Sequence, residues 1–213
     1  DGRQVHYAYN MLGSLTEISS GREHMADYSY DAMGRLSSAL GGGMRYDYRY
    51  YEGGLLKEKR ASGRILTSYT YDAEGRVTSM ADALGHVTSF EYDSRNRVTK
   101  VTDARGNATV FTYDLAGNVK TETNAKGVIT SYGYDANGNM LSMTDAAGTV
   151  RYVYDALNRV VRVIDRRGNT QSFTYDATGR ITSVMDRNGN ATQYVYDGNG
   201  NIIKTIDALG TVA

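Results

Sequence analysis

Carboxylates are the side chains of this sequence with the most obvious capacity for chemistry, and they recur at a fixed place. Each follows two aromatic residues spaced two apart and precedes a glycine or asparagine by three positions, as in residues 69–75, YTYDAEG. Eight aspartates stand at this place: Asp31, Asp72, Asp93, Asp114, Asp135, Asp155, Asp176 and Asp197. Two such carboxylates could hydrolyse a glycosidic bond if they were held about 5 to 9.5 Å apart.

Recurrence argues against that use, because a catalytic pair is normally singular whereas this aspartate returns in nearly every segment. An aspartate at the start of a turn accepts backbone N–H groups from the residues that follow it. We therefore expect the aspartates to shape turns, and a hydrolase that uses repeated carboxylates is the least favoured of the functions considered. Neither a nucleophile-elbow motif nor a phosphate-binding loop is present. The sequence predicts no catalytic and no cofactor-binding residue, and hence no enzyme.

Two segments resemble calcium-binding loops, namely residues 135–139 (DANGN) and 197–201 (DGNGN). Met140 and Ile202 stand where an EF-hand loop needs glycine, and Ala146 and Ala208 stand where it needs glutamate. The three histidines, His6, His24 and His86, show no metal-binding spacing, and the chain has no cysteine. No metal site is therefore predicted.

Composition narrows the classes of protein to which this chain can belong. The 213 residues carry 24 basic and 24 acidic side chains, with no basic stripe of the kind that binds nucleic acid. No apolar stretch approaches the 18 residues that indicate a membrane-spanning helix. Proline is absent while glycine occurs 24 times. Turns must therefore depend on glycine, asparagine and aspartate, which is typical of a hairpin-rich protein.

The sequence is a tandem repeat of 20 or 21 residues. We call the second aromatic residue of each repeat the marker tyrosine; the ten markers are Tyr9, Tyr30, Tyr50, Tyr71, Tyr92, Tyr113, Tyr134, Tyr154, Tyr175 and Tyr196. Another aromatic residue stands two positions before each marker. Because side chains alternate along a strand, the two aromatic residues of a pair share one face of a predicted strand. Internal repeats of this length decide the fold before any other feature.

Each repeat is expected to form two strands and two turns. The position four residues after the marker is glycine in eight repeats and asparagine (Asn96, Asn158) in two, which predicts a left-handed backbone there. In the second strand, apolar residues often stand three apart, as at Val77 and Met80. An ideal strand would place them on opposite faces, so either both faces are partly covered or a bulge re-aims one residue.

A second turn closes each of the last seven repeats, of the form Asp-x-x-Gly in six of them and Asn-x-x-Gly at residues 124–127. In the first three repeats it is degenerate, and we expect longer or mobile loops and looser pairing at residues 40–43 and 57–62. The chain is therefore predicted to be a single array over 1–213, less regular over 1–68 and regular over 69–213, and a fragment of a longer protein. The fold class is all-β, with about ten hairpins in one long, strongly curved antiparallel sheet that forms a spiral or shell wall.

The repeated pattern aromatic-x-Tyr-Asp-x-x-Gly-Arg-hydrophobic, followed by Asp-x-x-Gly, resembles the RHS repeats, also called YD repeats. In that family, which includes bacterial Rhs toxins, shell proteins of insecticidal toxin complexes and animal teneurins, the repeats form a sheet that spirals into a hollow shell. Toxin-carrying members end their repeats in a proline-containing self-cleavage motif. This chain has no proline, so no autoproteolytic residue carries over to it.

The resemblance implies a non-enzymatic segment of a shell that encapsulates or presents a C-terminal toxin or effector domain. Its partners would be that domain or neighbouring repeats, and it would be secreted or displayed on a bacterial surface as part of a larger polypeptide. The alternative is an extracellular adhesion module that binds glycans or partner proteins, since rows of tyrosines can bind sugar rings. Regular recurrence favours cross-strand packing of the tyrosines instead.

Overall fold

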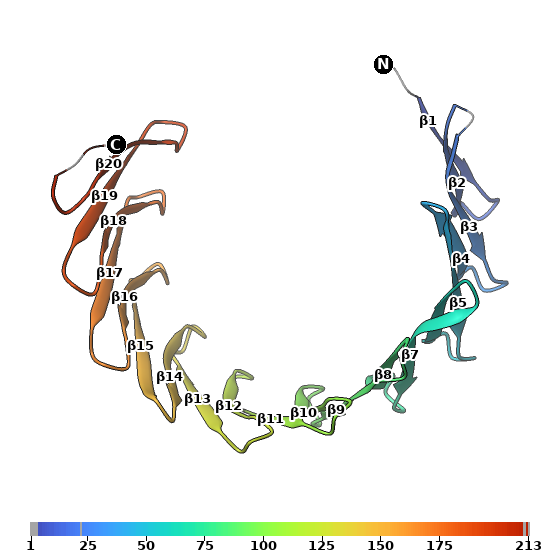
Figure 1. The fold of residues 1–213 in the computed structure, drawn as a ribbon, viewed down its shortest axis with the longest axis horizontal. Helices are drawn as coiled ribbons and strands as arrows, with labels where there is room; N and C mark the ends of the chain where they lie inside the picture. The colour runs from blue at the N-terminus through green and yellow to red at the C-terminus, as the bar shows by residue number, and fades with distance from the viewer. Residues whose placement is uncertain (1–3, 22, 211, 213) are drawn as a thin grey trace. The chain divides into compact units, whose positions relative to one another are not determined.

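The computed structural model describes residues 4–21, 23–210 and 212, and it contains twenty β-strands (Figure 1). In chain order the strands are β1 (Val5–Tyr9), β2 (Leu15–Ser20), β3 (Glu23–Tyr30), β4 (Leu36–Gly41), β5 (Met44–Tyr50), β6 (Leu56–Ala61), β7 (Arg64–Tyr71), β8 (Val77–Asp82), β9 (Val87–Tyr92), β10 (Val98–Thr102), β11 (Ala108–Tyr113), β12 (Val119–Thr123), β13 (Ile129–Tyr134), β14 (Met140–Asp145), β15 (Gly148–Tyr154), β16 (Val160–Ile164), β17 (Thr170–Tyr175), β18 (Ile181–Met185), β19 (Ala191–Tyr196) and β20 (Ile202–Ile206). Every repeat thus contributes the two predicted strands.

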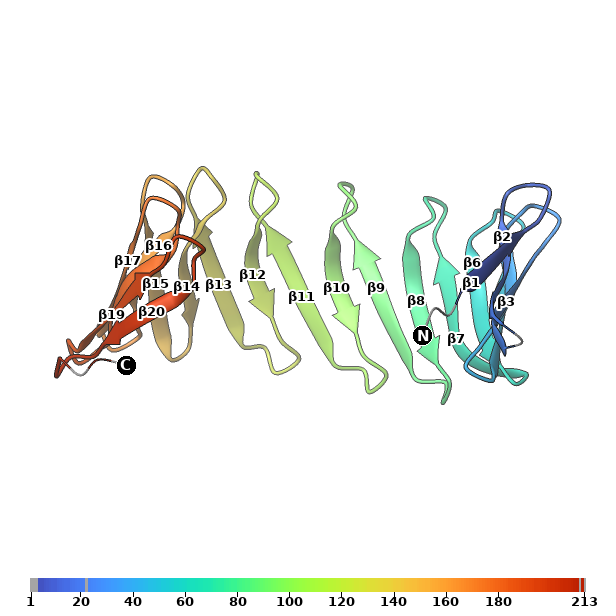
Figure 2. The same ribbon diagram turned by 90° about the horizontal axis from the view of Figure 1, so that it is seen from above.

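The chain divides into two compact units, residues 1–108 and 109–213. In the first unit β1 to β10 pair antiparallel in chain order, each with the next. In the second unit β11 to β20 pair in the same way. The row of strands bends within each unit, and successive turns lie at opposite ends of the strands (Figures 1 and 2). The predicted all-β, curved antiparallel fold of tandem hairpins is confirmed.

A β-bulge beside each marker tyrosine resolves the odd spacing of the apolar residues. Tyr71 pairs with Val77, but Thr70 pairs with Ser79, so one extra residue stands in β8. Cross-strand partners lie on the same face of a sheet. Val77 and Met80 therefore lie on the face of their partners Tyr71 and Tyr69, although they are three positions apart. The same register shift occurs in every repeat.

The first turn of each repeat adopts the predicted backbone. The residue four positions after the marker has a positive φ in all ten repeats, from 59° at Asn158 to 98° at Gly117. In the repeat of Asp72, the N–H of Gly75 donates to the carbonyl of Asp72 and the N–H of Asp72 donates to the carbonyl of Arg76. Glycine tolerates this region without the steric cost that a β-carbon adds, and asparagine is the commonest substitute.

The expectation of longer loops and looser pairing at residues 40–43 and 57–62 is wrong, while the second turn of the first repeat includes Arg22, which lies outside the described residues. Gly41 pairs with Met44, and Ala61 pairs with Arg64, so both connections are two-residue turns between well-paired strands. Both central residues of each turn have positive φ values: 58° and 75° at Gly42 and Gly43, 49° and 78° at Ser62 and Gly63. This is the twist that favours tight hairpins. Loss of the Asp-x-x-Gly pattern therefore shortens the turn instead of loosening it.

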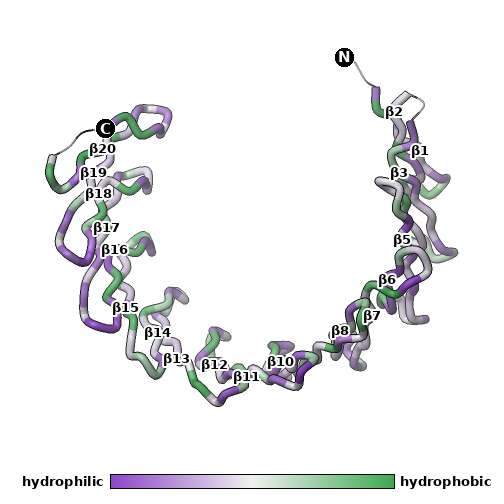
Figure 3. Tube along the Cα trace, in the orientation of Figure 1, coloured by the Kyte–Doolittle hydropathy of each residue, from purple (hydrophilic) through white to green (hydrophobic). Residues whose placement is uncertain are grey.

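Each unit is one layer thick and has no hydrophobic core. Among the described residues no hydrophobic side chain is fully buried. The two buried residues, Ser38 and Glu58, are polar, and each is 6% exposed. Hydrophobic and hydrophilic residues are interspersed along the chain (Figure 3). Over the described part of the chain, no helix is long and apolar enough to cross a membrane. Stability must therefore come from strand pairing and from contacts between neighbouring repeats.

Candidate functional site

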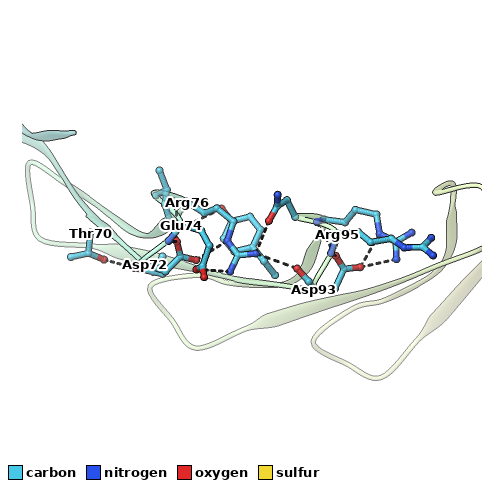
Figure 4. Close-up of polar contacts among 11 residues, drawn as sticks. Thr70, Asp72, Glu74, Arg76, Asp93 and Arg95 are labelled. Atoms are coloured by element: carbon cyan, nitrogen blue, oxygen red, sulfur yellow. Dashed lines mark hydrogen bonds and ion pairs between the residues drawn. The ribbon is translucent and has the colours of Figure 1, made fainter. Parts of the chain in front are cut away.

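Eight of the ten marker tyrosines are followed by an aspartate whose carboxylate accepts hydrogen bonds within the turn. In the repeat of Asp72, Oδ1 accepts the N–H of Glu74 at 3.1 Å and the N–H of Arg76 at 2.9 Å. Oδ2 accepts Nε of Arg76 at 2.7 Å (Figure 4). Both oxygens are therefore used within the turn, as expected for an aspartate that starts one. The side chains of Asp72 and Arg76 remain only 19% and 24% exposed.

The same arginine reaches the next repeat. Nη1 of Arg76 donates to the carbonyl of Asp93 at 3.2 Å and to Oδ1 of Asn96 at 2.9 Å (Figure 4). Its guanidinium carbon lies 4.8 Å from the ring centroid of Tyr92, which is a cation–π contact. The hydroxyl of Tyr92 in turn donates to the carbonyl of Val77 at 2.8 Å. We call the aspartate, this arginine and the next marker tyrosine the inter-repeat latch.

The latch recurs with little change in both units. Arginine to marker-ring distances are 4.6 Å for Arg35 over Tyr50, 4.6 Å for Arg159 over Tyr175, and 4.8 Å for Arg180 over Tyr196. Each of these arginines also donates to the carbonyl that follows that tyrosine. Marker hydroxyls donate to the carbonyl that opens the second strand of the preceding repeat at Tyr30, Tyr50, Tyr71, Tyr92, Tyr154, Tyr175 and Tyr196. Neighbouring repeats are thus joined by side chains as well as by strand pairing.

Asparagine replaces the arginine in three repeats of the second unit, at Asn118, Asn139 and Asn201. Each amide still donates to the Oδ2 of its own turn aspartate, at 2.9–3.1 Å. Its short side chain provides no guanidinium for the next marker ring. Asn139 instead donates to Oδ1 of Asn158 at 2.7 Å. These repeats keep the hydrogen bonds of the turn but lack the cation–π contact of the inter-repeat latch.

One repeat departs further, with Tyr51 and Leu55 in the places of the aspartate and the arginine. The backbone of the turn is unchanged, because the N–H of Tyr51 still donates to the carbonyl of Leu55 at 2.9 Å. The hydroxyl of Tyr51 donates to the carbonyl of Tyr69 at 3.0 Å, and its ring packs edge-on against Tyr71, 6.1 Å between centroids. Aromatic packing therefore connects these two repeats.

The turn hydrogen bonds also fix the ionisation of the carboxylates. The side chain and then the backbone N–H of Arg159 hold the pKa of Asp155 below its usual value. The side chain and backbone of Asn201 lower the pKa of Asp197 in the same way. A general acid for glycoside hydrolysis needs a raised pKa so that it keeps its proton. These aspartates are instead charged acceptors at neutral pH.

The calcium-like segments form the same turn. Oδ1 of Asp197 accepts the N–H groups of Asn199 and Asn201 at 2.9 and 2.8 Å, and Oδ2 accepts Nδ2 of Asn201 at 2.9 Å. Asp135 binds the corresponding groups of Asn137 and Asn139. Turn hydrogen bonds therefore account for the spacing of the oxygen-bearing side chains in these two segments.

The three histidines lie on different elements of the chain. His86 follows the second-turn pattern, with Nδ1 at 2.9 Å from Oδ2 of Asp82. His6 stands exposed in β1. His24 lies in β3 between two carboxylates, with Nδ1 at 3.5 Å from Oε1 of Glu17 and 3.5 Å from Oδ1 of Asp27. Sequence reasoning missed this cluster, because Glu17 comes from the neighbouring strand and His24 reaches it through a bulge.

The role of the latch arginine was also missed. The available signal was the joint occurrence of aspartate with arginine or asparagine four positions later, which the repeated motif contains. Its partners lie 15 to 20 residues further on, in the next repeat, and only the register of the strands shows that they meet.

A family model described as RHS Repeat matches six overlapping ranges of the chain: residues 50–87, 71–108, 113–150, 134–170, 154–189 and 175–212. These ranges cover well over half of the sequence. No curated protein matches it.

Solved structures of similar fold come from toxin complexes. The Photorhabdus luminescens Tc holotoxin pore with a mutation in TccC3 is 15% identical, over 95% of this chain and 14% of that one, with a TM-score of 0.78. TcdB2-TccC3 is 15% identical over 97% and 14%, with a TM-score of 0.74. TcdB2-TccC3-Cdc42 is 16% identical over 97% and 14%, with a TM-score of 0.73. The chain thus spans about one seventh of the length of these proteins, and the likeness is one of fold.

Proposed function

Since the chain belongs to the RHS repeat family, we propose that it is a stretch of non-enzymatic shell wall that encloses or presents a toxin or effector domain of a longer protein. One observation carries the proposal: no hydrophobic side chain is fully buried in the described residues, yet every repeat has the same ordered geometry. A domain with its own function normally encloses a hydrophobic core. A layer one strand thick is instead suited to separating two spaces.

The latches suit a wall that must stay continuous. Each hairpin alone would be marginally stable, since isolated two-stranded hairpins rarely hold together in water. A hydrogen bond and a cation–π contact from each arginine add side-chain attachments to the strand pairing. In this mechanism containment is passive: the wall keeps the enclosed domain from its targets until the shell opens.

The lowered pKa values of the turn aspartates support a structural use of the carboxylates over a hydrolytic one. By the same proposal, the chain is exported from a bacterium as part of a larger polypeptide and acts as a secreted or surface-displayed protein. Its partners are the enclosed domain and neighbouring repeats of the same protein.

The proposal is tested on the parent protein by limited proteolysis with mass spectrometry. Containment predicts that a domain outside the repeats resists protease in the intact protein and is cut once the repeats are unfolded by denaturant. A matched sample of that domain expressed alone gives its intrinsic rate of cleavage. Equal cleavage of the domain alone and within the intact parent would contradict containment.

Glycan adhesion remains the second candidate, favoured by the exposure of the first tyrosine pair, where Tyr7 and Tyr9 are 56% and 61% exposed. Further along, guanidinium groups cover faces of the marker rings Tyr50, Tyr92, Tyr175 and Tyr196, which leaves less ring surface for a sugar. Saturable glycan binding that is lost in Tyr7→Ala and Tyr9→Ala would support adhesion, whereas an array with no hits would count against it.

A further inference from the structure

The cluster of Glu17, His24 and Asp27 points to a function outside the shell wall. One ligand atom from each residue lies within 4.8 Å of the other two. We propose that these three side chains bind a divalent transition-metal ion, of which zinc suits the donor set best. Imidazole and carboxylate are common zinc ligands, and a site with three protein ligands leaves room for water.

Two distances within the cluster fit coordination better than hydrogen bonding. Nδ1 of His24 lies 3.5 Å from a carboxylate oxygen of Glu17 and 3.5 Å from one of Asp27. An N–H···O hydrogen bond normally spans about 2.7–3.2 Å. Zinc with bonds of about 2.0–2.2 Å holds tetrahedral neighbours roughly 3.3–3.5 Å apart. The imidazole is thus equidistant from both acids, at a separation compatible with an ion bound between them.

A bulge between β2 and β3 brings the imidazole to the acids. Glu17 pairs directly with Asp27, and Ile18 pairs with Ala26, but Ser19 pairs with His24. Met25 is therefore an extra residue in β3. Without it, His24 and Asp27 would lie on opposite faces, since they are three positions apart. With it, both share the face of Glu17.

Met25 and Ser19 stand where the next repeats place the arginines that neutralise the counterparts of these acids. Asp47 and Glu58 stand at the same repeat positions as Asp27 and Glu17, and they pair with Arg45 at 3.0 Å and Arg60 at 2.8 Å. Within the described ranges, the ion pairs of Glu17 and Asp27 are made with His24 alone. The cluster therefore combines two acidic side chains with one imidazole, a donor set that suits a divalent cation.

The surroundings leave space for an ion and its water. The cross-strand neighbours on the outer sides are Ala8 beside Glu17 and Leu40 beside Asp27, neither of which carries a charge. An open pocket of ≈ 560 Å³ adjoins the cluster and is lined by His24, Asp27 and Leu40 among others. The side chains of Glu17, His24 and Asp27 are 34%, 65% and 44% exposed, so small rotations can close the site around the ion.

Cobalt titration of the tag-free chain tests the site, because Co²⁺ replaces zinc and its visible absorption reports imidazole ligation at low coordination number. The wild-type chain should saturate at one equivalent, and zinc should displace the cobalt. His24→Gln and Asp27→Asn should each weaken binding by more than about tenfold, since loss of a ligand costs at least as much as loss of a supporting residue.

His86→Gln is the matched control, because His86 contacts a single carboxylate and should leave the titration unchanged. Far-ultraviolet circular dichroism without metal checks that each variant is folded. Equal cobalt binding in wild type and His24→Gln would overturn the proposal. So would a flat titration of the wild type, which would make His24 a bridge between two acids and nothing more. Neither result bears on containment by the shell.

Discussion

The guanidinium carbon of Arg76 lies 4.8 Å from the ring centroid of Tyr92, one repeat further along the chain. The arginine is oriented from behind by Asp72, which accepts its Nε at 2.7 Å. One side chain therefore stabilises its own turn and attaches that turn to its neighbour. The same geometry recurs at Arg35, Arg159 and Arg180, so this side-chain connection between neighbouring repeats is a repeated feature of the fold.

Replacing Arg76 by lysine should destabilise the chain nearly as much as replacing it by glutamine. The planar guanidinium carries several N–H donors in a fixed fork, whereas the lysine ammonium is a compact point charge. A lysine therefore cannot bind Asp72, donate to the carbonyl of Asp93 and lie over the ring of Tyr92 at the same time. We expect a loss of about 1–2 kcal/mol in the free energy of unfolding, measured by urea denaturation. Arg105→Gln, at the exposed tip of a second turn, is the control. Full retention of stability in Arg76→Lys would show that charge alone suffices.

The marker hydroxyl can be tested separately from its ring. Tyr92→Phe removes only the hydrogen bond to the carbonyl of Val77 and should cost about 0.5–1.5 kcal/mol. Tyr69→Phe is the matched control, because its hydroxyl makes no hydrogen bond within the described residues. Thermal melts of both variants give the comparison. A larger loss in Tyr69→Phe than in Tyr92→Phe would contradict the assigned role.

The left-handed backbone at the first turn predicts that alanine substitutions at two glycines of neighbouring repeats differ strongly in their cost to stability. Gly179 has a φ of +90°, whereas Gly198 lies outside the left-handed region, and a β-carbon would meet nothing within 4 Å at either place. Gly179→Ala should therefore cost about 1–2 kcal/mol and Gly198→Ala almost nothing. Gly179→Asn should be milder, as Asn96 and Asn158 already occupy this position. Equal melting temperatures for the two alanine variants would disprove the turn assignment.

Stability should fall steeply in acid. Turn hydrogen bonds lower the pKa of Asp93, Asp155, Asp186 and Asp197 in the folded chain. Such groups stabilise the fold above their unfolded pKa of about 3.8, and the stabilisation is lost as pH falls through the lower folded values. Melting temperature should thus change little from pH 7 to 5 and drop below pH 4. A constant melting temperature down to pH 2 would refute this linkage.

Much of this fold can be predicted from the sequence, because the local preferences for turns and strands agree with the period of the repeat. Glycine or asparagine four residues after each marker predicts the turn, and the aromatic pair predicts the strand that precedes it. The face shared by Val77 and Met80 could not be predicted, because a bulge adds no signal of its own to the sequence. The turns at Gly42 and Ser62 were predicted wrongly for a related reason. A degenerate pattern can encode a shorter turn as well as a looser one.

The candidate site was predictable only in part. Asp72 was correctly assigned to its turn, since its partners lie within four residues. Tyr92 is sixteen residues from Arg76, and the cluster at His24 needs a neighbouring strand and a bulge. Contacts of this kind depend on strand register, which no single segment of sequence specifies.

Face-specific photocrosslinking in the parent protein tests whether this chain is the wall of a shell around another domain. Tyr152 and Val153 are adjacent in β15 and lie on opposite faces, so a photoreactive residue at each samples one side of the wall. A shell predicts that one of the two positions captures a domain of the same protein that lies outside the repeats, and that the other does not. Capture from neither face, in a parent protein shown to be intact, would contradict the account of this chain as a containing wall.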